Sequence, residues 1–198
     1  MTVGLIFTKL RSVTRLPVMS LLLFSMACQG TDEATTDPET LSLTEMLGGI
    51  DTVGYSRALT ARTFNFPEDH GPHESFRTEW WYVTGNLNAQ DGDPFGFQFT
   101  IFRNALSPER SNGSSAWNTN QAYMGHFALT DINNDDFFFE EKFARGAVGL
   151  AGAETPPLRI WIEDWVLEGS NQNETVFPLR LSGGTDDIEL DLTLQEGK

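Results

Sequence analysis

The sequence predicts an all-β domain over residues 63–198, built as an antiparallel barrel or sandwich. The first observation behind this is a period of two, because apolar side chains alternate with polar or small ones over 95–101 and 188–194. That spacing places the apolar residues of a strand on one face. The second observation is turn chemistry. Clusters of Gly, Asn, Asp and Ser separate the apolar runs at 90–93, 133–136, 169–171 and 182–185.

About seven strands are predicted, at 79–87, 95–104, 121–131, 137–143, 158–167, 174–182 and 187–194. Short turns between consecutive strands favour antiparallel meander pairing. Two connections, 105–120 and 144–157, are longer than hairpin loops, and long loops on a β scaffold often carry function. Because the last predicted strand runs almost to Lys198, we expect a second β domain or a partner chain at the open edge.

The N-terminal residues 1–27 have the pattern of a signal peptide. A basic stretch with Lys9, Arg11 and Arg15 precedes an apolar run over 16–27 that is short for a membrane span. The lone cysteine, Cys28, follows Ser-Met-Ala in a run that resembles a bacterial lipobox, which predicts lipidation of Cys28. The predicted location is the periplasm or the outer membrane as a lipoprotein, or otherwise the secreted fraction.

Residues 28–62 are predicted to form a flexible linker. The stretch 29–40 is polar and small, whereas Ser42-x-x-Glu45 before Met46 and Leu47 predicts one short capped helix.

Composition also limits the partners of the chain. With 13 Lys and Arg against 28 Asp and Glu, the formal charge is −15, which repels phosphate backbones. No nucleic acid is expected as a partner, and contact with a membrane is expected only through the lipid anchor.

The segment Phe66–Tyr82 concentrates the residues that carry chemistry. It holds His70, His73, four carboxylates and the aromatic run Trp80-Trp81-Tyr82. It can be interpreted as a polar loop that enters the first strand, with Arg77 paired to Glu74 or Glu79. A metal site on His70, His73, Glu74 and the distant His126 lacks an HExxH or cysteine-rich spacing. A Ser-His-Asp hydrolase site at Ser75 lacks the Gly-x-Ser-x-Gly elbow. No metal and no cofactor are predicted.

Strand alternation predicts where the large polar and aromatic residues point. Trp81 shares a face with Val83 and Leu87, while Trp80 and Tyr82 face the other way. These aromatic residues are interpreted either as core or as a wall of a ligand cavity, to which Trp161 and Trp165 on one strand face would add. Arg103 falls on the apolar face of its strand. A buried Arg requires a partner, so it is expected either to cap the barrel end or to meet Glu79 or Asp131. His126 lies mid-strand and is interpreted as a core or site histidine.

Two motifs resemble those of the AttH/carotenoid 1,2-hydratase (hydroxyneurosporene synthase) family of lipocalin-like proteins. They are Phe66-Pro-x-Asp-His-Gly-x-His73 and Phe76-Arg-Thr-Glu-Trp-Trp-Tyr-x-Thr-Gly85. Further stretches that look like family motifs follow in family order at 95–103, 115–117, 126–131 and 158–165. The resemblance covers residues 64–194. It implies a calycin-type antiparallel β architecture, of which this chain would be the first of two domains.

The resemblance also implies binding of a hydrophobic isoprenoid or lipid ligand, and hydration of an isoprenoid C=C bond by a hydro-lyase. Such chemistry needs a proton donor, an apolar shell that excludes bulk water, and a positioned water. The candidate catalytic residues are Asp69, His70, Glu79 and Asp131. The candidate ligand-binding residues are His73, Arg77, Trp80, Trp81, Tyr82, Arg103, His126 and Trp161. The alternatives are a non-catalytic carrier, a domain that binds a protein through its edge strand, and a secreted hydrolase-type enzyme.

Overall fold

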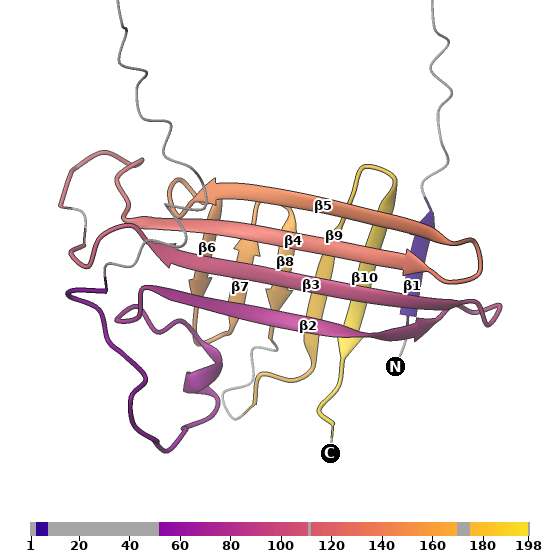
Figure 1. Cartoon of the computed structure of the whole chain (residues 1–198), viewed down its shortest axis with the longest axis horizontal. Helices are drawn as coiled ribbons and strands as arrows, with labels where there is room; N and C mark the ends of the chain where they lie inside the picture. Colours follow the sequence, from indigo (N-terminus) through magenta and orange to yellow (C-terminus); the bar gives the residue numbers. More distant parts are fainter. Residues whose placement is uncertain (1–2, 8–51, 111, 170–174, 198) are drawn as a thin grey trace, which may run out of the picture. The chain divides into compact units, whose positions relative to one another are not determined.

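The chain folds into two antiparallel β-sheets that pack face to face in an open sandwich (Figure 1). This computed structural model describes residues 3–7, 52–110, 112–169 and 175–197. Within that part, strands dominate and the one helical element is a 3-10 turn, η1 (Glu68–His70). The prediction of an all-β antiparallel fold is confirmed, as a sandwich and not as a closed barrel. No helix among the described residues has the length and apolar character needed to cross a bilayer.

The first sheet is a meander of four long strands in the order β2-β3-β4-β5. They are β2 (Thr78–Asn88), β3 (Pro94–Ala105), β4 (Gln121–Asp131) and β5 (Asp136–Arg145). Strand pairing places Glu79 opposite Arg103 and Arg103 opposite Tyr123, so these three side chains form one row across the inner face. The predicted strand 121–131 is confirmed at both ends, and the other three agree within two residues.

The second sheet has six strands in the order β1-β10-β9-β8-β7-β6. They are β1 (Val3–Phe7), β6 (Ala151–Glu154), β7 (Arg159–Ile162), β8 (Trp165–Glu168), β9 (Leu179–Gly184) and β10 (Ile188–Leu194). Strand β1 lies within the residues predicted as a signal peptide and pairs with β10. Cys28 and the short helix predicted at 42–47 lie outside the described residues.

Aromatic and branched side chains from the two inner faces form one core. The first sheet contributes Phe99, Ile101, Phe127 and Leu129, all of which are buried. Against them pack buried residues of the second sheet: Ile160, Ile162, Trp165, Leu167, Leu181, Leu190 and Leu192. Gly125 allows the close approach, because a Cβ there would lie 2.9 Å from the Trp165 ring. The alternation of apolar residues in the sequence therefore defines the two faces that meet.

Two predictions about the second sheet are wrong. The single strand predicted over 158–167 is a hairpin, since the chain turns at Glu163, which has a φ of 54°. In the hairpin Trp161 pairs with Val166 and Ile162 with Trp165, so the two tryptophans face opposite sides. Trp165 is buried in the core, while Trp161 points outward and its indole N–H donates to the Gly149 carbonyl at 3.0 Å. The predicted loop 144–157 also contains β6.

The opposite faces of the two tryptophans give a test by substitution. Trp165→Ala removes a fully buried ring beside Phe99 and Phe127, and we expect it to lower the free energy of unfolding by about 3–5 kcal/mol. Trp161→Ala serves as the control and should cost less than about 2 kcal/mol. Urea unfolding followed by circular dichroism measures both, and Trp165→Phe replaces the alanine variant if that does not fold. Equal losses for the two alanine variants would contradict the hairpin.

Candidate ligand site at the edge of the sandwich

A buried arginine lies at the end of the inner face where the candidate site begins. Arg103 is 1% exposed, and its Nε donates to Glu79 at 2.6 Å. Its Nη1 donates to the Gln121 side chain at 2.7 Å, and its Nη2 donates to the carbonyls of His73 and Phe76 at 3.0 and 2.8 Å. Every nitrogen of the guanidinium therefore has an acceptor, which a buried charge requires. The predicted pairing of Arg103 with Glu79 is present, and these contacts also fix the loop that carries His73.

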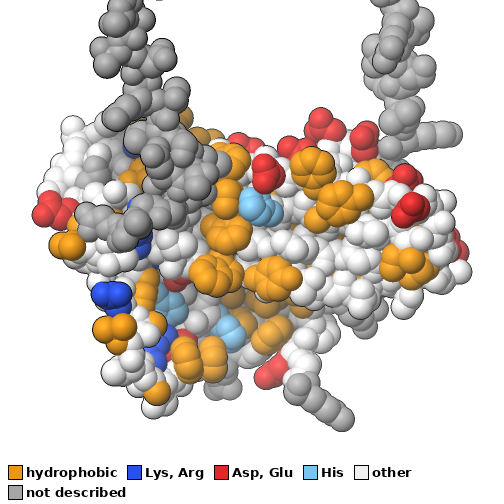
Figure 2. Space-filling view, viewed as in Figure 1, with side chains coloured by type: hydrophobic (Ala, Val, Ile, Leu, Met, Phe, Trp, Pro, Cys, Tyr) orange, Lys and Arg blue, Asp and Glu red, His pale blue; other side chains and the backbone are white. Residues whose placement is uncertain are grey.

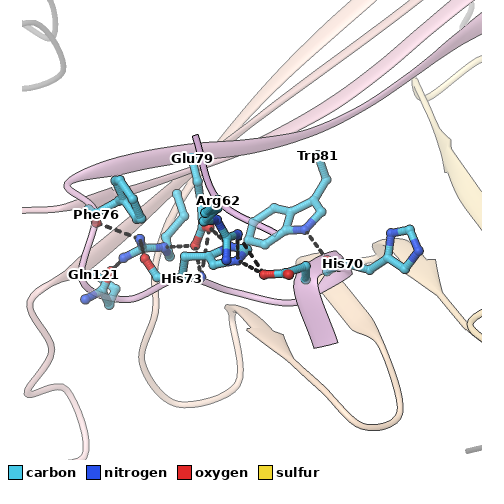
Figure 3. Close-up of polar contacts among 9 residues, drawn as sticks. Arg62, His70, His73, Phe76, Glu79, Trp81 and Gln121 are labelled. Carbon is cyan, nitrogen blue, oxygen red and sulfur yellow. Dashed lines mark hydrogen bonds and ion pairs between the residues drawn. The ribbon is translucent and has the colours of Figure 1, made fainter. Parts of the chain in front are cut away.

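His73 lies between two carboxylates (Figure 3). Its Nδ1 is 3.2 Å from Glu79 Oε2, and its Nε2 is 2.9 Å from Asp69 Oδ1. The His73 backbone N–H also donates to Glu79, at 2.9 Å. The Arg62 Nη2 lies 3.1 Å from His73 Nε2. With its one ring proton on Nδ1, His73 accepts from Arg62 at Nε2; with a second proton on Nε2, it donates to Asp69 instead. The ring is thus placed to hold or release a proton at Nε2.

Asp69 is held as a carboxylate. Hydrogen bonds from His73, from the Asn65 backbone N–H and from the Arg62 side chain hold the pKa of Asp69 well below its usual value. Arg62 Nη2 donates to Asp69 Oδ1 at 2.7 Å. Arg62, Asp69, His73, Glu79 and Arg103 therefore form one continuous polar chain, from the exposed loop to the buried end of β3.

The carboxyl groups predicted as candidate acids do not suit that task. A protonated carboxylic acid at neutral pH needs an environment that raises its pKa. The pKa of Asp131 is lowered, mainly by the Asn134 side chain, with help from the backbone N–H groups of Asn134 and Asn133. Asp131 also lies opposite Phe95, eight residues along the sheet from the row of Arg103, and so about 26 Å from Glu79. Glu79 accepts from Arg103 and from the His73 N–H, as a carboxylate does.

A cavity of about 350 Å³ opens beside this polar chain; we call it the edge cavity. It lies where β2, the edge strand of the first sheet, faces strands of the second sheet. Apolar walls come from Trp81, Val83, Leu158, Leu167 and Leu179, and the rim carries Asp69, His70, Gly71 and His73. The Trp81 indole N–H donates to the His70 carbonyl at 2.9 Å, which anchors the rim to β2. The result is a cavity with apolar side chains along part of its wall and with Asp69, His70 and His73 at its rim, a combination typical of small-molecule sites.

The structure brings some of the predicted site residues together and separates others. Asp69, His73, Glu79 and Arg103 are in contact, and Trp81 lines the cavity. His70 does not converge with His73, since its ring lies 4.4 Å from the Phe66 ring and turns the other way (Figure 3). His126 and Trp161 point away from the interior. Among the described residues no group of three potential ligands could hold a metal ion.

Trp80 and Tyr82 alternate with Trp81 and are exposed on the outer face of the sheet, so they reach the edge cavity only along the rim of β2. Arg77 immediately precedes β2, and its carbonyl accepts from the Ala105 N–H at 2.7 Å. Two residues of the site were not predicted: Arg62, which falls in the predicted linker, and Gln121, at the start of β4. The leucines of the cavity wall follow strand alternation, but the sequence alone does not show which inner positions remain uncovered.

Comparison with known proteins identifies a family for this chain. The model of the AttH-like family matches residues 57–198. A crystal structure of a candidate AttH protein from Nitrosomonas europaea is similar, with 32% sequence identity and a TM-score of 0.54. The match covers 69% of this chain and 39% of that chain, so the present chain spans well under half of its neighbour. No curated protein matches the chain.

The buried arginine can be tested by a pair of substitutions. Arg103→Met leaves Glu79 and two backbone carbonyls without their donor, and we expect a loss of about 3–5 kcal/mol in the free energy of unfolding. Arg103→Met combined with Glu79→Met removes both charges and should recover part of that loss. Urea unfolding of the two single variants and the double variant measures the coupling. A loss under about 1 kcal/mol for Arg103→Met would refute the organising role of this residue.

Proposed function

Because the chain belongs to the AttH-like family, we propose that it is an exported lipocalin-like protein that binds an isoprenoid or lipid ligand in the edge cavity. The observation that carries this proposal is the contrast within the cavity. Leucine, valine and tryptophan side chains line one part of it, and polar groups gather around His73 and Asp69 at its rim. An elongated apolar molecule with one polar or reactive end fits this division. The ligand's apolar part would lie against Leu158, Leu167 and Leu179.

Binding is tested by placing a charge in the wall. Val83→Arg puts a guanidinium into the edge cavity, and we expect it to weaken binding of a long acyclic isoprenoid alcohol at least about tenfold, through desolvation of the charge. Asn86→Arg is the matched control, because it adds the same group to the exposed outer face of β2. Quenching of tryptophan fluorescence on titration gives both dissociation constants. Equal affinity of the two variants would locate the ligand elsewhere.

A second candidate function is hydration of a C=C bond, and the position of His73 favours it. Its imidazolium would give the Nε2 proton to one alkene carbon, leaving a tertiary cation. The water oxygen would then bond to the other carbon, and a proton of that water would return to the imidazole. Glu79 lies at Nδ1, and Asp69, 2.9 Å from Nε2, would release its contact with the Nε2 proton as that proton moves to the alkene. In this mechanism His73, which the sequence analysis places among the ligand-binding candidates, is the proton donor.

Hydration is tested with His73→Gln. Glutamine preserves a hydrogen-bonding side chain but cannot donate a proton as an acid, so we expect turnover to fall about 100-fold or more while ligand affinity changes less than about threefold. Mass spectrometry after incubation with acyclic isoprenoids detects the mass of one added water. If His73→Gln retains turnover, His73 is not the acid. If the unaltered protein binds the isoprenoid and forms no hydrated product, the chain is a carrier.

A further inference from the structure

The outer face of the first sheet carries an unusual set of exposed aromatic side chains. Trp80, Tyr82, Phe137, Phe139 and Phe143 are all about half exposed or more. Figure 2 shows the apolar side chains gathered over this face of the molecule. Exposed aromatic residues of this number on one face indicate a binding surface, because a folded chain otherwise buries such side chains. Since strands alternate, this face lies on the opposite side of the sheet from the edge cavity.

The outer face is uneven. Its central strands carry small residues at Gly96 and Ala128 but larger ones at Phe102, Met124 and His126, and the Phe102 ring contacts the rings of Trp80 and His126. Phe137 and Phe139 on β5 form a wall beside Ala128, whereas Trp80 and Tyr82 lie across the sheet on β2. A hollow of about 370 Å³ lies along the β5 wall, lined by Gln98, His126, Phe127, Ala128, Phe137, Phe139, Glu140 and Glu141. We call this feature the outer trough.

The charge of the outer trough is negative. Glu141 lies across the ladder from His126, and its Oε1 is 3.3 Å from His126 Nε2. The outward positions of the four strands carry one basic residue, Arg145, at the far end of β5, where it donates to the Thr119 carbonyl at 3.3 Å. In Figure 2 the visible Lys and Arg side chains lie at the left-hand end of the molecule. Among the described residues no Lys or Arg side chain therefore lines the trough.

A second observation comes from the floor. Thr100 is 2% exposed although its side chain points to the outer face, beneath the larger neighbours Tyr82 and His126. Its hydroxyl is the one buried side-chain polar atom in the described residues that has no hydrogen-bond partner. Buried polar groups are nearly always satisfied, so an orphan hydroxyl marks a place where a partner is missing. It lies in the same row as His126 and Glu141.

We propose that the outer trough binds an organic cation, a quaternary ammonium or protonated amine carried on an apolar body. Aromatic faces attract such cations through the negative charge of their π systems. The rings of Phe137 and Phe139 stack with their centroids 6.0 Å apart and an interplanar angle of 21°, so they offer two nearly parallel aromatic faces. Glu141, two residues from Phe139 on the same face, supplies the complementary charge. The site is independent of the function proposed for the edge cavity.

Charge also argues against a second copy of the chain as the occupant. Face-to-face pairing of two copies would bring the Glu141 carboxylates of both together, on proteins of formal charge −15. An organic cation instead satisfies the aromatic side chains and Glu141 at once. A surface that serves to bind a protein can be told apart from a cation site by charge selectivity. It would not bind a cation more tightly than a neutral molecule of the same shape.

The experiment compares choline with 3,3-dimethylbutan-1-ol, a neutral molecule of the same shape. Both are titrated into the full chain at millimolar concentrations, and binding is followed by saturation-transfer NMR of the methyl groups and by amide shifts. We expect choline to bind and to shift the signals of His126, Phe139 and Glu141, whereas the neutral alcohol does not. Equal binding of the two molecules, or no binding of choline, would overturn the proposal.

Substitutions then locate the cation. Phe139→Ala and Glu141→Gln should each raise the dissociation constant of choline about twofold to fivefold, the factor that one exposed cation–π contact supplies. Phe64→Ala is the matched control, because Phe64 is 59% exposed but its ring already has the Arg62 guanidinium 4.7 Å above it. An unchanged dissociation constant in Phe139→Ala contradicts the site. So does sedimentation showing a dimer that Phe139→Ala dissociates, because a second copy would then cover the face.

Discussion

The position of the candidate site depends on one buried charge, the guanidinium of Arg103. A charge with 1% exposure cannot remain without acceptors, and four groups converge on it. Two of these are backbone carbonyls of the loop before β2, so the path of that loop is determined by an arginine on β3. Glu79 accepts a hydrogen bond from Arg103 and a second one from the His73 backbone N–H. The placement of His73 at the mouth of the edge cavity is therefore a consequence of satisfying Arg103.

Much of the first sheet could be predicted from the sequence, because long strands with strict alternation leave little ambiguity. The same alternation placed Arg103 on the inner face, and the cost of burying its charge then led to Glu79. The strand boundaries of the second sheet were harder to predict from the sequence. The turn at Glu163-Asp164 has neither Gly nor Asn, and its central residue adopts a positive φ as Glu. Strand β6 is Ala-Gly-Ala-Glu, which has weak strand propensity and is defined by its pairing with β7.

The site residues that the sequence did not reveal are those recruited by tertiary contact. Arg62 lies in a polar stretch that has no periodicity, and only the folded loop brings it to Asp69 and His73. The choice of acid also required the structure. The sequence does not distinguish Asp69, Glu79 and Asp131 as candidate acids. In the structure, hydrogen bonding lowers the pKa of Asp69 and of Asp131, and Glu79 accepts a hydrogen bond from Arg103. What distinguishes these groups is the number of donors around each, which no spacing in the sequence encodes.

The first sheet has two chemically different faces, and this follows from one property of a strand. Along β2, the side chains of Glu79, Trp81 and Val83 point to the interior. Those of Trp80 and Tyr82 point to the outer face. A sheet with apolar residues on both faces is normally covered on both, and here the described residues cover only one. The aromatic residues of the outer face lie outside the core, and they are close to a buried hydroxyl without a hydrogen-bond partner and to the Glu141 carboxylate. The proposed binding of a cation gives these groups a role, and alternation lets either face be altered without displacing the side chains of the other.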